Sequence, residues 1–419
     1  MNTATRKKRV QSFALLILLV VILSVLGACN NEQNKHSSNE EVSPPAPTSI
    51  SVPVNEADPT SEQDDGKKEK ISEKMDDPAM RERFSELDTF LTERKFNGVI
   101  LFARGEDVLF SRAYGDADME ERVPNTTDTV FRIGSLSKAF TAYAILALQE
   151  EGKLNVNDPV SDYIDHPVVN NGMTIHQLVT HTAGLGDYVA EIGQMEQLEL
   201  IRWTQGVTAQ KLLQFALDAQ TKPVHPGKGY HYSNTGYVVL GALIEKASGM
   251  SYADYVQQRI LGPLELNHTG YLEKDRKQEP FAKGYEYDGK AEASPFMEYD
   301  ASVFYSAGGL YASAEDLHKW GLAILRKEGL SEESYARMLT PEQAVNGEGY
   351  GYGWNINDAK GWIYHTGHTV DFTSLIRLKS DQDTIAIFLT NIGDSMQRGG
   401  LETKINQMLA DFESNLLLQ

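Results

Sequence analysis

Strand-like segments at both ends of the folded part of the chain enclose a long stretch with helical spacing, and this layout limits the possible folds most. Apolar runs at 99–103 and 108–112 flank a tight Gly-containing turn, which predicts a β-hairpin. Strand-like runs return only late, at 361–365, 372–378 and 384–390. Short connections between the late runs favour antiparallel pairing. We therefore expect one sheet that is assembled from both ends of the domain.

The intervening stretch, from about Asn155 to Gly270, has apolar residues mostly at helical spacing, in segments 175–181, 207–217, 237–247 and 252–261. Further helices are predicted near Pro78 and over residues 402–416. These patterns predict an α+β fold in which helices flank an antiparallel β-sheet and a mostly helical subdomain is inserted. We expect an active cleft where sheet and insert meet.

The first 29 residues have the three zones of a secretory signal peptide: basic residues at 6–9, an apolar run at 13–26, and a small-residue site. The run Leu26-Gly-Ala-Cys29 resembles a bacterial lipobox, which implies lipid modification of Cys29. Cys29 is the only cysteine in the chain, so an internal disulfide is impossible. We expect an exported lipoprotein anchored on the extracytoplasmic face of the membrane. The alternative is an uncleaved anchor with an incidental cysteine.

Residues 30–77 are rich in Ser, Pro, Asn, Glu, Asp and Lys and contain almost no large apolar side chains. Such a stretch buries too little surface to offset chain entropy, so we expect a disordered tether followed by one domain over 78–419. The formal net charge of -20 argues against nucleic acid as a partner.

Ser135 and Lys138 lie three residues apart where an apolar helix is predicted to begin, with Gly152 as its stop residue. Residues at this spacing share a helix face, so the lysine amine would lie beside the serine hydroxyl. A base next to a hydroxyl can produce a nucleophile, and the helix N-terminus adds positive potential. The alternative is a helix cap beside a solvated lysine.

Two more short motifs follow. Tyr232 and Asn234 precede the predicted helix at 237–247, and His365-Thr366-Gly367 ends a strand-like run. Each motif alone also fits a structural role, such as a packed tyrosine beside a capping asparagine or a buried histidine. The ordered set of Ser-x-x-Lys, Tyr-x-Asn and His-Thr-Gly arises by accident far less often.

With these three motifs the chain resembles the serine β-lactamase-related hydrolases, which include class C β-lactamases, D-alanyl-D-alanine carboxypeptidases and penicillin-binding protein-like esterases. The resemblance covers most of the chain from about Asn97 to Asn391. It extends to framework segments outside the three motifs, at 178–185, 241–245, 263–266, 306–311 and 352–354.

The resemblance implies a role for each matching residue. Ser135 corresponds to the acylated nucleophile, Lys138 to its neighbouring base, and Tyr232 to the group that relays a proton to the leaving group. Whether Lys138 or Tyr232 is the general base stays open. The residues implied to contact the substrate are Asn234, His365, Thr366 and Gly367. The backbone N–H groups implied to form an oxyanion hole are those of Ser135 and His368.

Two positions depart from the family pattern. His365 replaces the lysine of most class C β-lactamases; a neutral histidine offers a hydrogen bond and becomes cationic only below about pH 6.5. It either binds a substrate carboxylate or has a structural role at the end of its strand. Asp371 lies where many relatives have a glycine-containing turn, and we expect it to reshape the edge of the cleft.

The sequence thus predicts a cell-envelope serine hydrolase acting on D-alanyl peptides, esters or β-lactams, including wall-derived D-amino-acid substrates. Two alternatives are a catalytically idle wall-fragment- or penicillin-binding lipoprotein and a purely adhesive lipoprotein. No cofactor is implied. The absence of a Gly-x-Ser-x-Gly motif argues against an α/β-hydrolase. The histidine pairs 176/181 and 365/368 lack the spacing of a zinc helix motif, so no metal is expected.

Overall fold

The structure, a computed structural model, describes residues 69–71, 78–192, 195, 207–220, 224–271, 280–287, 293–295, 301–345 and 348–393. The α-helices are α2 (Pro78–Glu93), α3 (Ser137–Glu150), α4 (Ile175–Val179), α5 (Tyr188–Ile192), α7 (Ala209–Asp218), α8 (Asn234–Ser248), α9 (Tyr252–Val256), α10 (Tyr305–Gly308), α11 (Ala314–Leu325) and α12 (Glu332–Met338). Short helical turns are η1 (Gly134–Leu136), η2 (Val160–Asp162), η3 (Gln257–Leu261) and η5 (Ala301–Val303). The strands are β1 (Glu69–Ile71), β2 (Gly98–Arg104), β3 (Asp107–Tyr114), β4 (Asp116–Asp118), β5 (Val123–Pro124), β6 (Phe131–Arg132), β7 (Gly270–Tyr271), β8 (Tyr285–Tyr287), β9 (Ala293–Pro295), β10 (Leu310–Ala312), β11 (Glu342–Val345), β12 (Glu348–Tyr350), β13 (Asn355–Asn357), β14 (Trp362–His368), β15 (Thr373–Lys379) and β16 (Thr384–Thr390).

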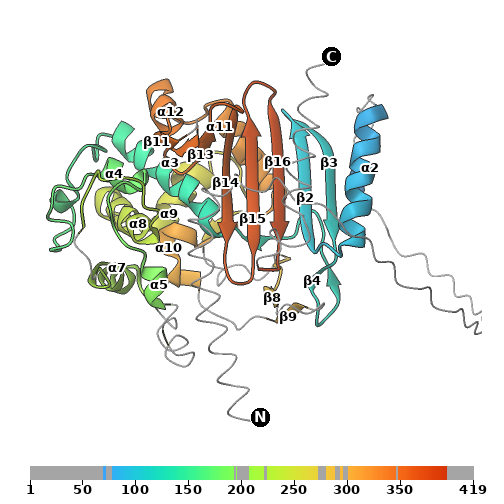
Figure 1. Ribbon diagram of the computed structural model, residues 1–419, viewed down its shortest axis with the longest axis horizontal. Helices are drawn as coiled ribbons and strands as arrows, with labels where there is room; N and C mark the ends of the chain where they lie inside the picture. The colour runs from blue at the N-terminus through green and yellow to red at the C-terminus, as the bar shows by residue number, and fades with distance from the viewer. Residues whose placement is uncertain are drawn as a thin grey trace, which may run out of the picture.

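One antiparallel sheet joins the two ends of the domain, as the sequence predicts. Its strand order is β1-β3-β2-β16-β15-β14-β13-β12-β11, so the N-terminal hairpin pairs with the last strand of the C-terminal meander. The β2–β16 pairing runs from Gly98 opposite Thr390 to Arg104 opposite Thr384. Figure 1 shows this sheet with the helical part beside β14. The α+β architecture is therefore confirmed.

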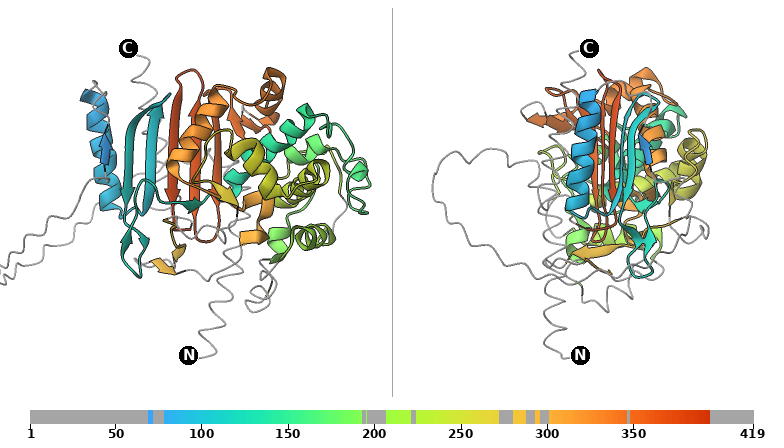
Figure 2. Two further views of the ribbon diagram at one scale, coloured as in Figure 1. Left: turned by 180° about the vertical axis from the view of Figure 1, so that it is seen from behind. Right: turned by 90° about the vertical axis from the view of Figure 1, so that its right-hand side faces the viewer.

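The sheet has a helical layer on each face because successive side chains of a strand point to opposite sides. Ile100 and Phe102 pack with α2, where the Phe84 ring stacks on Phe110 at 4.9 Å between centroids. The intervening residues Val99 and Leu101 belong to the larger core, which contains α3 and α11. The right-hand view of Figure 2 shows α2 on one side of the sheet and the other helices on the opposite side.

Helix α3 is the central helix of the larger core. Every side chain from Ser137 to Leu148 is buried, and such all-round burial is typical of a helix inside a domain. The helix ends as predicted: Gly152 has φ +68°, and its N–H donates to the carbonyl of Gln149 at 3.0 Å. The α3 start is held by Ser137, whose Oγ accepts the Leu310 N–H at 3.0 Å.

The predicted tether needs one correction. Its residues Glu69–Ile71 form β1, which pairs with β3 at the edge of the sheet, so the ordered domain begins before Pro78. The predicted signal peptide with Cys29 and the rest of the predicted tether lie outside the described residues, as does the predicted helix at 402–416. Among the residues that the structure describes, no helix has the length and apolar composition needed to cross a bilayer.

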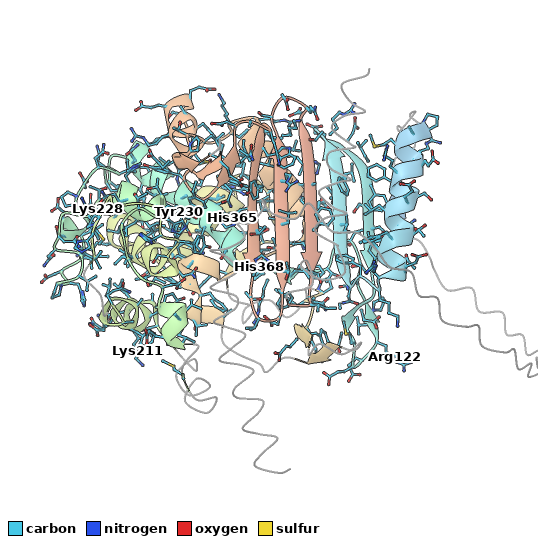
Figure 3. The ribbon with its side chains drawn as sticks, in the orientation of Figure 1. Arg122, Lys211, Lys228, Tyr230, His365 and His368 are labelled. Carbon is cyan, nitrogen blue, oxygen red and sulfur yellow. The ribbon has the colours of Figure 1, made fainter. Side chains whose placement is uncertain are left out.

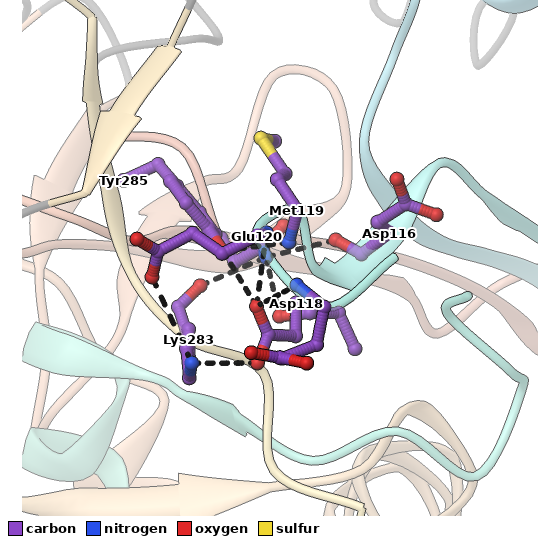
Figure 4. A network of polar contacts seen from close by, with 9 residues as sticks. Asp116, Asp118, Met119, Glu120, Lys283 and Tyr285 are labelled. Carbon is purple, nitrogen blue, oxygen red and sulfur yellow. Dashed lines mark hydrogen bonds and ion pairs between the residues drawn. The ribbon is translucent and has the colours of Figure 1, made fainter. Parts of the chain in front are cut away.

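A polar network attaches the segment 280–287 to β4 below the sheet (Figure 4). Lys283 Nζ contacts Asp118 Oδ2 at 2.6 Å and Glu120 Oε2 at 3.7 Å, while the Met119 N–H donates to the Tyr285 hydroxyl at 2.6 Å. Asn391 at the end of β16 donates to the Lys283 carbonyl at 2.9 Å. These contacts connect the middle of the chain to the segment after β3 and to the end of β16.

Candidate active site

Ser135 lies in η1, a short turn between β6 and the start of α3, and its side chain is partly exposed. The turn begins with Gly134 at φ +50°, a left-handed conformation that glycine adopts without strain. The carbonyl of the preceding Ile133 accepts the Ser374 hydroxyl from β15 at 2.8 Å. The sheet and the core thus fix the backbone that presents Ser135.

Lys138 is fully buried one helical turn beyond Ser135, and its amine has three oxygen partners. Nζ lies 3.0 Å from Ser135 Oγ, 2.7 Å from Asn234 Oδ1 and 2.7 Å from the carbonyl oxygen of Ala307. The predicted proximity of Lys138 and Ser135 is present in the structure. The sequence interpretation did not assign Ala307, although it lies within the framework segment 306–311.

Burial lowers the pKa of Lys138 to about 7, and the Asp187 carboxylate opposes this shift. Desolvation disfavours the ammonium form, so a substantial fraction of the amine is neutral near neutral pH. The rings of Tyr232 and Tyr237 lie 4.9 Å and 5.4 Å from Nζ and favour the ammonium when it forms. Lys138 is therefore able to exchange a proton with Ser135 at physiological pH.

Tyr232 precedes α8, which is capped by Ser233, whose Oγ accepts the Gly236 N–H at 3.2 Å. The Tyr232 hydroxyl hydrogen-bonds with the Ser135 side chain. Burial raises the pKa of Tyr232 well above its usual value, so the phenol keeps its proton. This arrangement suits a proton donor or relay, and it makes Lys138 the better base of the two.

Asn234 connects Lys138 to a residue that the sequence interpretation missed. Its Oδ1 accepts from Lys138, and its Nδ2 donates to Asp187 Oδ2 at 2.8 Å. Asp187 lies on the loop before α5, two residues beyond the framework segment that ends at Leu185. The sequence offered no signal for it beyond that proximity.

The end of β14 packs directly against η1. A Cβ atom on Gly367 would lie 1.9 Å from the Ile133 carbonyl oxygen, and one on Gly134 would lie 3.0 Å from the His368 backbone nitrogen. Both glycines are required for this close approach. This packing brings the backbone of His368 next to the turn that carries Ser135. That the backbone N–H groups of Ser135 and His368 form an oxyanion hole stays a prediction.

Comparison with known proteins agrees with this geometry. The family described as Beta-lactamase matches residues 73–407, which is most of the chain. The protein belongs to the beta-lactamase family. A penicillin-binding protein of Bacillus subtilis (strain 168) is 32% identical over 320 residues, which cover 73% of this chain and 70% of that protein.

Solved structures give the same result. The penicillin binding protein from Bacillus halodurans superposes with a TM-score of 0.65 and 28% identity, covering 78% of this chain and 98% of that one. A D-stereospecific amidohydrolase from Streptomyces sp. has a TM-score of 0.63 and 25% identity, covering 76% of this chain and 96% of that one. The fold of this beta-lactamase-family protein is therefore the one its motifs implied.

The charge of the His365 imidazole differs from the expectation based on sequence. Its Nε2 lies 3.1 Å from the Tyr350 hydroxyl and its Nδ1 lies 2.6 Å from the Thr366 carbonyl oxygen. A carbonyl only accepts, so Nδ1 carries the proton and Nε2 accepts from Tyr350. Burial, followed by the charge of Lys138, lowers the pKa of His365 to about 3. The predicted change of charge near pH 6.5 is wrong, because the imidazole stays neutral far below it.

Figure 3 places His365 and His368 at the side of the sheet that faces the helical part, with Tyr230 close to His365. The ring of Tyr230, which is 38% exposed, lies 6.0 Å from that of Tyr350. Thr366 and His368 are partly exposed on β14, while Gly367 is buried between them. Along this part of β14, the buried His365 and Gly367 therefore alternate with the partly exposed Thr366 and His368.

Asp371, which is expected to reshape the edge of the cleft, lies in the turn between β14 and β15, and its effect on the cleft stays a prediction. Its side chain is buried in the β14–β15 turn, where Thr369 Oγ1 donates to Oδ1 at 2.9 Å. An Arg132 nitrogen lies 3.8 Å from Oδ2. The Phe372 N–H donates to Thr369 Oγ1 at 3.0 Å and closes the turn. Within the described part of the chain, no group of three or more His, Cys, Asp or Glu side chains is arranged to hold a metal ion.

Proposed function

We propose that the protein is a serine hydrolase that forms an acyl-enzyme on Ser135. The observation that supports this most is the 3.0 Å contact between Ser135 Oγ and the buried Lys138 amine, whose pKa is about 7. A nucleophile within hydrogen-bonding reach of a base that is partly neutral at working pH is the arrangement that acyl transfer needs.

The proposed reaction has two halves. The neutral Lys138 amine takes the Ser135 proton while Oγ bonds to the acyl carbon, and the resulting oxyanion accepts from the backbone N–H groups of Ser135 and His368. As the bond to the leaving group breaks, the Tyr232 phenol, which hydrogen-bonds with Ser135, passes a proton to the leaving group and is reprotonated by the Lys138 ammonium, which returns to its neutral form. In the second half, the neutral Lys138 amine takes a proton from the attacking water and gives it to Ser135 Oγ as the bond from Oγ to the acyl carbon breaks.

For substrates we propose esters and amides of D-amino acids, with D-alanyl peptides and β-lactams as further candidates. The names of the relatives support this class, since one is a D-stereospecific amidohydrolase and others are penicillin-binding proteins. The buried, neutral His365 donates from Nδ1 to the Thr366 carbonyl and accepts at Nε2 from Tyr350, so it offers no free donor and no charge to a substrate carboxylate. The neutral acyl donors therefore rank first.

A catalytically idle binding protein is the alternative. It is not favoured because Ser135, Lys138, Tyr232 and Asn234 form one connected polar set, which binding alone does not require. An adhesive role would require none of the four.

For location we propose an exported lipoprotein, held to the extracytoplasmic face of the membrane through a lipid on Cys29 and a tether over residues 30–68. Support comes from the sequence alone, which has a basic start, an apolar run and a lipobox-like site.

A turnover panel on the purified domain tests the proposed activity. It contains a D-amino acid amide, a D-alanyl-D-alanine peptide, a short-chain aryl ester and a chromogenic cephalosporin, with the Ser135→Ala variant as control. The native protein should turn over at least one of these compounds, and the Ser135→Ala variant should turn over none. Equal turnover by both proteins, or no turnover and no covalent adduct with any compound, would overturn the proposal.

A further inference from the structure

Asp187 is a partly buried carboxylate whose oxygen atoms are taken by donors from two elements. Oδ2 accepts from Asn234 Nδ2 at 2.8 Å, and Oδ1 accepts the Val189 N–H at 3.0 Å. The backbone N–H of Asn234 also donates to the carboxylate. Asp187 therefore lies at the N-terminus of α8, where the helix dipole stabilises an anion.

The loop that carries Asp187 is fixed against the same end of α8. The Ser233 hydroxyl donates to the Gly186 carbonyl at 2.9 Å, and the Tyr188 N–H donates to Thr235 Oγ1 at 3.0 Å. The position of the carboxylate relative to Asn234 is thus determined by contacts on both sides of it.

The orientation of the Asn234 amide follows from the charge of Asp187. A carboxylate only accepts, so the amide nitrogen must face it, which turns Oδ1 toward Lys138. The reversed amide would set oxygen against carboxylate and nitrogen against ammonium. Both contacts would then be repulsive.

We propose that Asp187 is a positioning residue that orients Asn234 toward Lys138 and, through its negative charge, sets the pH at which Lys138 becomes a base for Ser135. This inference rests on the proposed serine hydrolase function. Asp187 contacts no reacting atom; it acts through Asn234 and through its electrostatic field.

The other titratable groups near Lys138 are Tyr232 and Tyr237 at α8, His181 before α5, and His365 on β14. Burial keeps both histidines neutral and both tyrosines protonated. Asp187 is the acidic group beside them: burial raises the pKa of its carboxyl, while the Val189 N–H, Lys138 and Asn234 oppose that shift and favour the anion. Its carboxylate favours the ammonium form of Lys138 and opposes the effect of burial.

The test measures the pH dependence of Ser135 labelling by a neutral fluorophosphonate, together with kcat/KM for a neutral aryl ester. Asp187→Asn removes the charge with little change in size. Asp187→Ser also removes it and keeps a hydroxyl that can cap the Val189 N–H, so it serves if the first variant does not fold. Glu191→Gln, in helix α5 directly after the loop that carries Asp187, is the matched control for loss of a carboxylate.

Without the Asp187 charge, the midpoint of the acid limb should move down by about one pH unit, at the low end of the effect of an opposite charge. The plateau rate should also fall, because the Asn234 amide is no longer held in one orientation. Glu191→Gln should leave both values unchanged.

A lower plateau or lower Tm with an unchanged midpoint in the Asp187 variants would overturn the inference, since a merely structural residue gives that result. An upward shift would overturn it as well. Failure of the proposed function is a separate result: it would appear as labelling that persists in Ser135→Ala, or as no labelling of the native protein.

Discussion

Lys138 and Tyr232 both contact Ser135 and both are titratable, but burial shifts their pKa values in opposite directions. Burial disfavours the charged form of each group, so it lowers the pKa of the lysine to about 7 and raises that of the tyrosine well above its usual value. The same desolvation therefore produces an amine that can accept a proton and a phenol that retains one. Sequence alone left this choice open, because it depends on burial.

The first prediction concerns Lys138. Because its ammonium loses a proton at about pH 7, kcat/KM for a neutral ester should rise through that pH and then level off. Lys138→Arg should lower kcat/KM by at least about 100-fold, because a guanidinium does not give up its proton at usable pH. A pH–rate profile of both proteins checks this. An arginine variant with near-native activity would show that Lys138 acts through charge alone.

The second prediction concerns His365, whose pKa of about 3 keeps the imidazole neutral. The ratio of kcat/KM for a D-alanyl-D-alanine peptide to that for its C-terminal amide should stay constant between about pH 5 and about pH 8, since His365 gains no charge there. His365→Lys should reduce activity on both substrates in parallel. A ratio that falls as pH rises through about 6.5 would restore the carboxylate-binding role.

Two elements, β14 and η1, meet through glycines, and this contact aligns the backbone of His368 with that of Ser135. The sequence patterns located β14, β15, β16, α3 and α8 because each is a continuous apolar run or has clear periodicity. They did not locate the three- or four-residue strands β11, β12 and β13, which are too short for a period to register. Asp187 and Tyr350 were missed for a related reason: their roles depend on tertiary neighbours and not on local pattern.

The third prediction tests that contact. A methyl group on Gly367 would lie 1.9 Å from the Ile133 carbonyl oxygen, so Gly367→Ala must push β14 away from η1. The misplaced His368 N–H should lower kcat by about 100-fold or more, the effect of losing an oxyanion donor. Gly236→Ala in α8 is the control, because its Cβ would meet only ordinary contacts, the nearest at 3.6 Å. Native kcat in Gly367→Ala would contradict the assigned oxyanion site.

At the scale of the whole molecule, the sheet that supports the site is assembled from both ends of the domain, and β1 extends its edge beyond the predicted boundary. That boundary was placed at Pro78 because the residues before it are polar. A three-residue edge strand held by backbone pairing leaves little trace in composition. The predicted antiparallel sheet with flanking helices is confirmed, since apolar runs at both ends of the domain needed partners.

The fourth prediction compares two truncations. Deleting residues 1–66 keeps β1 and should leave both Tm and kcat/KM at the values of the longest soluble form. Deleting residues 1–77 removes β1 and exposes the edge of β3, so Tm should fall. The value of kcat/KM for a small ester should stay unchanged, because β1 lies at the far side of the sheet from β14. Equal Tm values would show that β1 adds no stability.

The fifth prediction addresses location. Cys29→Ala should abolish incorporation of labelled fatty acid in cells and leave the protein as a retained precursor or in released form, because the lipid-bearing side chain is gone. Unchanged membrane partitioning together with an unchanged mature mass would contradict the lipoprotein proposal.

Intact-mass spectrometry after exposure to a fluorophosphonate tests the central claim most directly, because it reports the nucleophile without requiring the natural substrate. The native protein should gain the mass of one adduct, and peptide mapping should place it on Ser135. Ser135→Ala should gain none while retaining the native circular dichroism spectrum. An adduct on another residue, or the same mass gain in the alanine variant, would contradict the assignment of Ser135 as the residue that Lys138 activates.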